Sequence, residues 1–272
     1  VAGEIFEIGP NDKGLKKGDK VILDPYIYCG KCYPCSIGRT NCCENLQVLG
    51  VHVDGGMAEY FSHPEHLLHK VPQDMSWDLI PLAEPLTIAL HSIHRGQVKA
   101  GETVAISGAG PIGLMAALVA LEYGATPILI DILQERLEYA KSLGVTHIVN
   151  PAETNVVEAI HDITGGVMAQ VVIEASGANR AIRDTLDYAS FAGRIVFTGW
   201  PKADTELPTA MITKKELDLR GSRTSAGEFQ EAIELIYNGK INVEATVSKN
   251  VSFDALAQSV ADQSDTPEKF LK

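Results

Sequence analysis

The sequence lacks a long apolar run and has little positive charge. No stretch of its 272 residues approaches the roughly 20 apolar residues of a membrane-spanning helix. The formal net charge is −12, and such an excess of acidic groups repels nucleic-acid phosphates and acidic membrane surfaces. With 45% hydrophobic and 21% charged residues, the chain can bury sizeable cores in more than one domain. We therefore expect a cytoplasmic globular protein that binds neither nucleic acid nor membrane.

Cysteine is also scarce. There are only five, an odd number, and no apolar secretory segment opens the chain, which argues against a disulfide framework. Four of them lie in the run Cys29-x2-Cys32-x2-Cys35-x7-Cys43, whose short spacers let one loop wrap a single tetrahedral cation. A ferredoxin-type cluster requires a shorter last spacer followed by proline, whereas Glu44 follows here. The pattern predicts a closed structural zinc site, and spacing alone leaves Cys42 or Cys43 open as the fourth ligand.

Neither end carries the signals of a chain terminus. The chain starts at Val1 without methionine, in a segment that reads as a mid-domain strand. It stops at Lys272 on an apolar pattern without a capping or turn signal. We therefore expect further sequence on both sides, above all an N-terminal segment.

The first part of the chain, residues 1–86, reads as a small β domain. Short alternating strands are separated by Gly and Pro, for example Lys20–Asp24 before the cysteine loop and Met57–Phe61 after Gly55-Gly56. The cysteine loop 29–43 forms a metal lobe inserted in this domain.

From residue 87 to 222, strands alternate with helices, which predicts a parallel sheet. Leu133, Leu137 and Ala140 share one helical face, and the same spacing recurs from Val156 to Ile163. These stretches predict a doubly wound Rossmann domain, and residues 223–272, with a helix over Glu228–Asn238, are predicted to return to the first domain. The strand candidates are Thr103–Ser107, Pro127–Ile130, His147–Val149, Gln170–Glu174, Arg194–Thr198 and Glu216–Leu219.

A dinucleotide loop, Gly108-Ala-Gly110-Pro111-Ile112-Gly113, follows the first of these strands and opens an apolar helix. Gly108 permits the tight turn, Gly110 lets the backbone approach a pyrophosphate, and Gly113 lets the helix pack closely on the sheet. Free N–H groups at the helix start face the phosphates. A lone motif of this kind is weak evidence, but its place between a strand and a helix makes it a strong prediction of a dinucleotide site.

Asp131 ends the next strand and bears on the choice of cofactor. A carboxylate there accepts hydrogen bonds from ribose hydroxyls and repels a 2′-phosphate, so NAD is favoured over NADP. Two alternatives remain: Asp131 only caps the next helix, or Arg136 receives a phosphate, although Ile132 and Leu133 offer no donor beside it.

The cysteine lobe and the dinucleotide loop, together with Gly55–Tyr60, Glu84-Pro-Leu86 and Glu174–Gly177, resemble the zinc-dependent medium-chain dehydrogenases. The resemblance runs essentially end to end and is strongest to the sorbitol and threonine dehydrogenase branch. It implies an α/β fold in which a partial GroES-like β-barrel catalytic domain accompanies the Rossmann domain. It also implies Cys43 as the fourth ligand of the structural zinc, NAD as cofactor, and a homodimer or homotetramer.

The resemblance further implies a catalytic zinc held by a Cys, a His and carboxylates. Only Glu84 matches one of these positions here, as a direct ligand or through water. The family's Cys and its His-Glu pair would precede Val1, so we expect the chain as given to be inactive. From the residues alone, a hydrogen-bonded structural acid at a domain junction remains an alternative for Glu84.

Further candidates lie near the expected clefts. His52 and Arg223 are candidates to line the substrate cleft, although structural roles are the commoner reading for both. His63, His66 and His69 invite a metal site, but Pro64 interrupts them and their spacing fits no helical face. Five residues close the fourth and fifth strands at the carboxyl ends, where open α/β sheets bind ligands. By resemblance they lie along the nicotinamide ribose and ring: Ala175, Ser176, Gly177, Thr198 and Gly199.

Together these features predict a zinc- and NAD-dependent oxidoreductase. It would oxidise a secondary alcohol of a small polyol or sugar acid by hydride transfer to NAD. The alternatives are an L-threonine 3-dehydrogenase-like enzyme and a non-catalytic, NAD-sensing regulatory protein on the same fold.

Overall fold

The computed structural model describes residues 1–266, which fall into two units. The first unit is formed by Val1–His91 with Arg223–Lys240, and the second by Ser92–Ser222 with the chain from Ile241 onward. The predicted domain limits stay a prediction, and they differ from these units because they place all of 223–272 in the first domain. In the structure, η4 (Val243–Thr246) packs against α3 of the second unit, and the Tyr139 hydroxyl donates to the Ala245 carbonyl at 2.8 Å.

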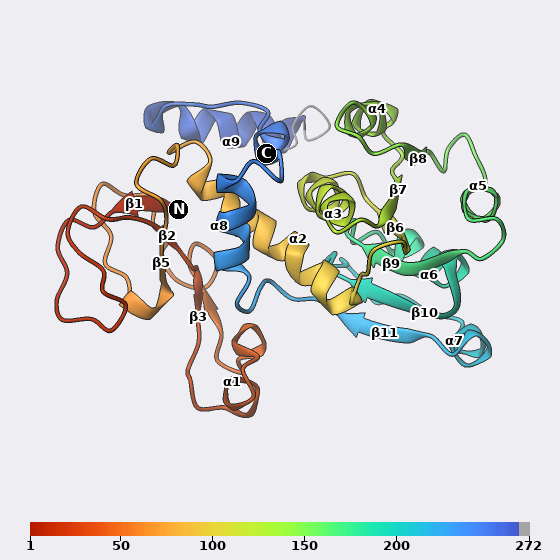
Figure 1. Ribbon diagram of the computed structural model, residues 1–272, viewed down its shortest axis with the longest axis horizontal. Helices are drawn as coiled ribbons and strands as arrows, with labels where there is room; N and C mark the ends of the chain where they lie inside the picture. The colour runs from red at the N-terminus through yellow and green to blue at the C-terminus, as the bar shows by residue number, and fades with distance from the viewer. Residues whose placement is uncertain (267–272) are drawn as a thin grey trace. The chain divides into compact units, whose positions relative to one another are not determined.

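A six-stranded parallel sheet forms the centre of the second unit (Figure 1). Its order is β11-β10-β9-β6-β7-β8, and all neighbouring strands are parallel. The chain therefore starts in the middle at β6, moves outward to β7 and β8, and then returns to the other side of β6. The predicted doubly wound Rossmann sheet is confirmed. The strands are β6 (Thr103–Ser107), β7 (Thr126–Ile130), β8 (His147–Val149), β9 (Ala169–Glu174), β10 (Ala189–Phe197) and β11 (Asp218–Gly221).

The predicted strand limits are accurate for the first four strands and less so for the last two. β6 and β8 have the predicted bounds, and β7 and β9 each begin one residue earlier. β10 already begins at Ala189, before the predicted Arg194. The last prediction, Glu216–Leu219, was wrong by two residues because Glu216 takes a left-handed conformation, with φ of 50°, that ends α7.

Helices connect successive strands of this sheet. Asn155 caps α5 by accepting a hydrogen bond from the N–H of Val157 at 3.1 Å, which explains why that helix begins where it does. None of the helices in residues 1–266 is both long and apolar enough to span a membrane. The connecting helices are α3 (Pro111–Glu122), α4 (Gln134–Ser142), α5 (Val156–Ile163), α6 (Asn179–Tyr188) and α7 (Thr209–Lys215), and α9 (Leu256–Asp265) follows the last strand.

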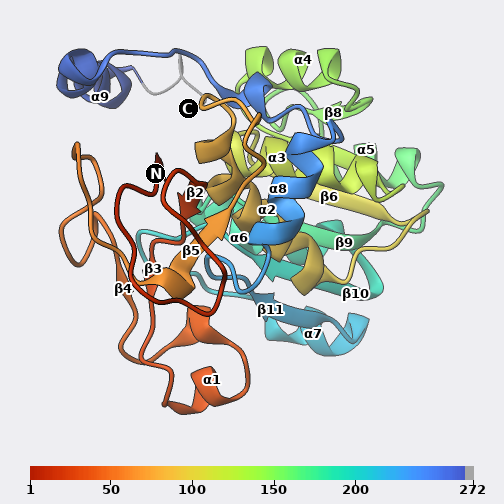
Figure 2. The ribbon, with the colours of Figure 1, turned by 60° about the vertical axis from the view of Figure 1, so that its left-hand side comes forward.

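Both faces of the sheet are covered, because alternate strand residues point to opposite faces. On one face, Ala105, Ile128 and Val172 share a core with apolar residues of α5, α6 and α7. Their strand neighbours are also fully buried, and α3 packs against β6 and β7. Helix α7 packs against β10 and lies near the edge strand β11 (Figure 2).

The first unit contains short antiparallel strands. β1 (Ala2–Glu4), β2 (Lys20–Leu23) and β5 (Leu68–Lys70) form one sheet, and β3 (Tyr26–Ile27) pairs with β4 (Gln47–Val48). Arg223–Lys240, the return segment of this unit, contributes α8 (Phe229–Tyr237), whose bounds are close to the predicted Glu228–Asn238. The predicted strand Met57–Phe61 was wrong: these residues are exposed and pair with no strand in the described chain, so no ladder forms.

Helix α2 (Ala83–Gly96) carries Glu84 and crosses the limit between the two units. Pro85 lies in its first turn, where the missing N–H removes no intrahelical hydrogen bond. The sequence pattern had identified this stretch only as an apolar junction. The helix fixes the position of Glu84 relative to the following buried residues Leu86 and Leu90.

Candidate metal and cofactor sites

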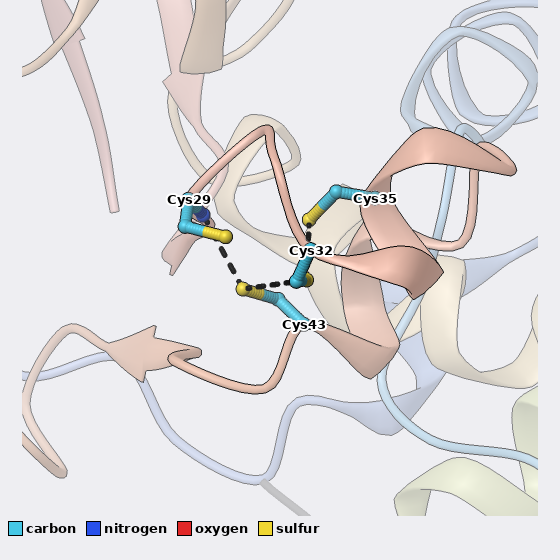
Figure 3. A group of neighbouring side chains, drawn as sticks. All are labelled: Cys29, Cys32, Cys35 and Cys43. Atoms are coloured by element: carbon cyan, nitrogen blue, oxygen red, sulfur yellow. Dashed lines mark hydrogen bonds between the residues drawn. The ribbon is translucent and has the colours of Figure 1, made fainter.

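Four cysteine side chains converge in the loop that connects β3 and β4 (Figure 3). Their sulfur atoms all lie within 4.8 Å of one another, and Cys32 Sγ is 3.4 Å from Cys35 Sγ and 3.8 Å from Cys43 Sγ. Cys32 directly precedes the single helical turn α1 (Tyr33–Ser36), and Cys35 lies within this turn. Cys43 is buried in a small core with Tyr26 and Leu46. The predicted set is thus brought together by local structure.

This arrangement fits a structural zinc. A tetrahedral site with zinc–sulfur distances of about 2.3 Å separates neighbouring sulfurs by roughly 3.8 Å. The observed separations are of that size. Four soft sulfur donors bind zinc in preference to magnesium or calcium, which take oxygen ligands. Because four protein ligands complete the tetrahedron, a zinc here would stabilise the loop and leave no position for substrate.

Cys42 contributes no sulfur to this group, although it is adjacent to Cys43 in sequence. The backbone N–H groups of Cys29 and Asn45 donate to Cys43 Sγ at 3.3 and 3.4 Å, and such donors stabilise a thiolate. Backbone N–H groups of Lys31 and Cys32 lower the pKa of Cys29 to about 6. The geometry therefore favours Cys43, the ligand that the resemblance implied.

Glu84 lines a cavity of about 590 Å³ within the first unit, together with Leu23, Tyr26, Val48 and Met57. The Tyr26 hydroxyl donates a hydrogen bond of 2.5 Å to Glu84 Oε1. Tyr26 is buried, and this burial raises its pKa. The negative charge of the neighbouring Glu84 raises the pKa of Tyr26 further, by a smaller amount. Tyr26 therefore remains a protonated donor, and one oxygen of Glu84 is held in a fixed position.

A second carboxyl group accompanies this pair. Burial, and less strongly the charge of Glu84, raises the pKa of Asp24 to about 7, although the Tyr26 N–H donates to Asp24 Oδ1 at 2.9 Å. Sequence analysis identified neither Asp24 nor Tyr26. The sequence showed only that Asp24 ends a predicted strand and that Tyr26 follows it closely. Tyr26 lies 58 residues from Glu84, so no local pattern links the two.

A catalytic zinc set does not form around Glu84 in the described residues. Within 1–266, the cysteine group is the only one in which three or more His, Cys, Asp or Glu ligand atoms converge. A catalytic zinc needs about three protein ligands. The residues around this cavity therefore do not fit that ion by themselves.

The structure does not bring His52 or Arg223 into the Glu84 cavity. His52 is exposed, and its Nδ1 accepts a hydrogen bond from the Val48 N–H at 3.0 Å. The Arg223 carbonyl accepts a hydrogen bond of 2.7 Å from the Asn41 side chain. Their predicted substrate roles stay predictions.

The three histidines His63, His66 and His69 do not form a metal group in the described residues. His63 Nε2 contacts the Asp24 carbonyl at 2.9 Å, and the His66 ring packs edge-on against Tyr28. The His69 ring stacks on Phe229 with ring centres 4.4 Å apart. Each histidine has a separate structural environment.

A buried polar network holds the cysteine lobe inside the first unit. His91 Nδ1 lies 2.7 Å from Glu228 Oε1, and His91 Nε2 lies 3.2 Å from Asn41 Nδ2. Glu228 Oε2 also accepts the Ala226 N–H at 2.6 Å. Because Asn41 immediately precedes Cys42, these contacts connect the lobe to α2 and to the return segment.

The glycine loop of the second unit has the geometry that a dinucleotide requires. Gly108 has φ of 104°, and a Cβ on Gly113 would lie 1.8 Å from the Gly108 carbonyl oxygen, so the loop and the helix are in backbone contact. A Cβ on Gly110, by contrast, would meet nothing within 4 Å. Gly110 is the N-cap of α3, whose first N–H groups therefore face open space suited to a phosphate.

Asp131 follows β7 at the same edge of the sheet. Its Oδ2 accepts the Ala109 N–H at 2.6 Å, and its Oδ1 accepts the Leu133 N–H at 2.8 Å. The carboxylate therefore orders the glycine loop and the turn before α4, and each oxygen keeps acceptor capacity for a ribose hydroxyl. Arg136 lies one helical turn further, on α4.

The loops after β9 and β10 meet at this edge. A Cβ on Gly199 would lie 2.2 Å from the Gly177 nitrogen, and one on Gly108 would lie 3.0 Å from the Ser176 nitrogen. The Thr198 hydroxyl oxygen is buried and has no hydrogen-bond partner in the described structure. An open helix start, an acidic acceptor and this hydroxyl lie along the carboxyl edge of one sheet, and they fit NAD.

Comparison with known proteins identifies the family. A zinc-type alcohol dehydrogenase-like protein of Haemophilus influenzae is 58% identical over 274 residues, covering 100% of this chain and 80% of that protein. The chain belongs to the zinc-type medium-chain alcohol dehydrogenases. Residues 1–73 match the model of the alcohol dehydrogenase GroES-like domain, and residues 111–238 match that of the zinc-binding dehydrogenase.

Two further members of this alcohol dehydrogenase family are informative. L-galactonate-5-dehydrogenase of Escherichia coli K12 is 34% identical over 261 residues, covering 95% of this chain and 76% of that protein. A crystal structure of an alcohol dehydrogenase of E. coli CFT073 in complex with NADH is 34% identical, with a TM-score of 0.88. The alignment covers 96% of this chain and 77% of the E. coli chain. The predicted family and fold are confirmed.

Proposed function

We propose that the protein oxidises a secondary alcohol of a small polyol or sugar acid and transfers the hydride to NAD. The open start of α3 at Gly110 is the observation that carries this proposal. It lies where β6 separates β7 from β9, at the switch point where open α/β sheets bind dinucleotides. The similarity to L-galactonate-5-dehydrogenase supports a sugar acid or polyol as the substrate class.

The residues around the sheet edge have separate tasks in this proposal. Pro111, Ile112 and Gly113 begin the helix whose N–H groups bind the pyrophosphate, and Asp131 accepts from the adenosine ribose. Residues 175–177 and 198–199 hold the nicotinamide half. When bound, NAD would supply the hydride acceptor for oxidation of the carbinol carbon, and the hydroxyl proton would be released to solvent.

Within the first unit, the Glu84 cavity is the proposed place for the substrate. Glu84 accepts a hydrogen bond from Tyr26 on one oxygen, which leaves the other oxygen to bind a substrate hydroxyl or water. The cavity volume of about 590 Å³ is in the range of pockets that hold small molecules. His52 and Arg223 do not line this cavity, and their substrate roles stay proposals drawn from the sequence.

We also propose a cytoplasmic location and a homodimer or homotetramer. β11 lies at the edge of the six-stranded sheet, and an edge strand presents backbone N–H and C=O groups that a second copy can pair with. Light scattering after size exclusion should give the mass of two or four chains. A mass of one chain at micromolar concentration would contradict the proposed assembly.

Titration of NADH into the purified protein tests the cofactor part of the proposal. We expect saturable binding of about one NADH per chain, which Gly110→Val should abolish because the added side chain fills the phosphate space. Gly221→Ala is the matched control, since a Cβ there also meets nothing within 4 Å but lies on the edge strand β11. Equal NADH affinity of the wild type and Gly110→Val would contradict the proposed site.

A further inference from the structure

Glu174 is an acid with no exposed surface at the carboxyl end of β9. Its carboxylate has no cationic partner among the described residues. Instead, its Oε1 accepts the Ser176 N–H at 2.8 Å, the Ser176 hydroxyl at 2.5 Å and the Gly177 N–H at 3.0 Å. Burial raises the pKa of Glu174, while these three donors oppose that rise. Because burying a carboxylate is costly, such a group needs several donors to remain in place.

The backbone of Glu174 binds a second loop. Its carbonyl oxygen accepts the N–H groups of Thr198 and Gly199, at 2.8 and 2.9 Å, which lie just beyond β10. A Cβ on Gly199 would lie 2.6 Å from Glu174 Oε2. A single residue therefore holds the loop after β9 through its side chain and the loop after β10 through its main chain.

The loop that Glu174 holds also touches the glycine loop. The Ala175 N–H donates to the Ser107 carbonyl at 2.8 Å, and a Cβ on Gly108 would lie 3.1 Å from Ser176 Cβ. Gly177 has φ of 69°, a left-handed conformation that most residues adopt only with strain. Glycine adopts this conformation readily but samples many others, and the hydrogen bond from the Gly177 N–H to Glu174 restrains it to this one.

The sheet order tells which half of the cofactor this affects. Asp131 and β7 lie on one side of β6, and β9 and β10 lie on the other. A dinucleotide whose pyrophosphate is bound at the start of α3 crosses this switch point, with one nucleoside on each side. If the adenosine half faces Asp131, the nicotinamide half lies over the loops that Glu174 holds.

We propose that Glu174 is the positioning residue of the nicotinamide half of the cofactor site. It does not touch the cofactor; it sets the conformation of residues 175–177 against Gly108 and Gly199. This inference rests on the proposed binding of NAD and adds the residue that organises one half of that site.

The variant Glu174→Gln tests the proposal because it keeps the shape of the side chain and removes one acceptor oxygen. We expect the affinity for NADH to fall roughly tenfold, as for the loss of a hydrogen bond to a charged group, while the affinity for AMP stays within about twofold. AMP reports the adenosine half alone. Calorimetric titration of both ligands gives the two affinities.

Glu102→Gln is the matched control. Glu102 pairs with Arg194 at the opposite end of the same sheet, so its loss should lower stability without changing the ratio of NADH to AMP affinity. If Glu174→Gln does not fold, Glu174→Asp retains the charge, shifts it by one methylene, and should show the same selective loss of NADH affinity.

Two results would overturn the proposal. Equal losses of NADH and AMP affinity would make Glu174 a residue of general stability, and unchanged NADH affinity would show that the loop does not depend on it. If the wild type itself binds no NADH, the proposed function fails instead, so the two failures are distinguishable.

Discussion

The hydroxyl group of Tyr26 donates a 2.5 Å hydrogen bond to Oε1 of Glu84. The two residues come from β3 and from the first turn of α2, and both line the same cavity of the first unit. A neutral donor held by burial beside a carboxylate restricts the carboxylate to one orientation. This pair gives Glu84 a defined geometry that its sequence context did not reveal.

Tyr26→Phe should lower kcat/KM for NADH formation by roughly tenfold to a hundredfold, because a hydrogen bond to a charged group contributes about 1.5–3 kcal/mol. Tyr28→Phe is the matched control, since the Tyr28 ring packs edge-on against His66 and does not line the cavity. Steady-state kinetics would show equal effects of both substitutions if the Tyr26–Glu84 pair were only structural.

Cys43→Ser should reduce the zinc content from about one ion per chain to well below half, because one of four thiolate ligands is lost. Cys42→Ser should keep the full content, since Cys42 contributes no sulfur to the group. Metal analysis after dialysis compares the two variants. The reverse result, zinc kept in Cys43→Ser and lost in Cys42→Ser, would show that the ligand assignment is wrong.

Asp131→Ala or Asp131→Arg should lower the ratio of NAD to NADP affinity by about tenfold, because a ribose acceptor is removed or a phosphate partner is added. Asp131→Asn should change the ratio less, since one oxygen can still accept the Ala109 N–H. Asp162→Ala, an exposed acid of the same unit, is the control. An unchanged ratio in all variants would reduce Asp131 to a residue that orders the loop.

His69 should make the first unit less stable in acid. Burial lowers the pKa of His69 to about 4 from 6.5, so the folded state binds fewer protons than the unfolded state between these values. The stabilisation is therefore present above about pH 6.5 and is lost as the pH falls toward 4. Between pH 7 and pH 5 this loss amounts to about 2 kcal/mol.

His69→Phe should remove this dependence while keeping the stacking on Phe229. Urea denaturation at pH 7 and pH 5 gives the difference between the variant and the wild type. His161→Gln, at an exposed site, should follow the wild type. If the free energy of unfolding falls by the same amount from pH 7 to pH 5 in the wild type and in His69→Phe, the assignment to His69 is wrong.

Sequence analysis was accurate where one short segment contains the whole signal. The cysteine run and the glycine loop are each a short continuous segment, and β6 is a largely buried apolar run. Their residue types and spacing therefore predicted both the geometry and the ligand class. The limits of β11 were missed because a left-handed Glu216 is not a common helix-ending residue.

Contacts between distant segments could not be predicted in the same way. Tyr26 and Glu84 are 58 residues apart, and His91 and Glu228 are 137 residues apart. No local pattern links such residues, because their contact depends on how β3, α2 and the return segment pack. The sequence places Glu174 in the motif Glu174–Gly177. Only the buried hydrogen bonds of its carboxylate show that it binds the loop after β9.

The most direct test of NAD-linked alcohol oxidation is the rate of NADH formation, followed by absorbance at 340 nm. The measurement uses protein produced from the complete natural coding sequence, with sorbitol, L-galactonate and L-threonine as substrates. We expect NADH formation with a polyol or sugar acid, and Glu84→Ala should reduce it by at least about a hundredfold, since the carboxylate proposed to bind the substrate is removed. Tight NADH binding without turnover on any of these substrates would contradict the account and favour an NAD-sensing protein.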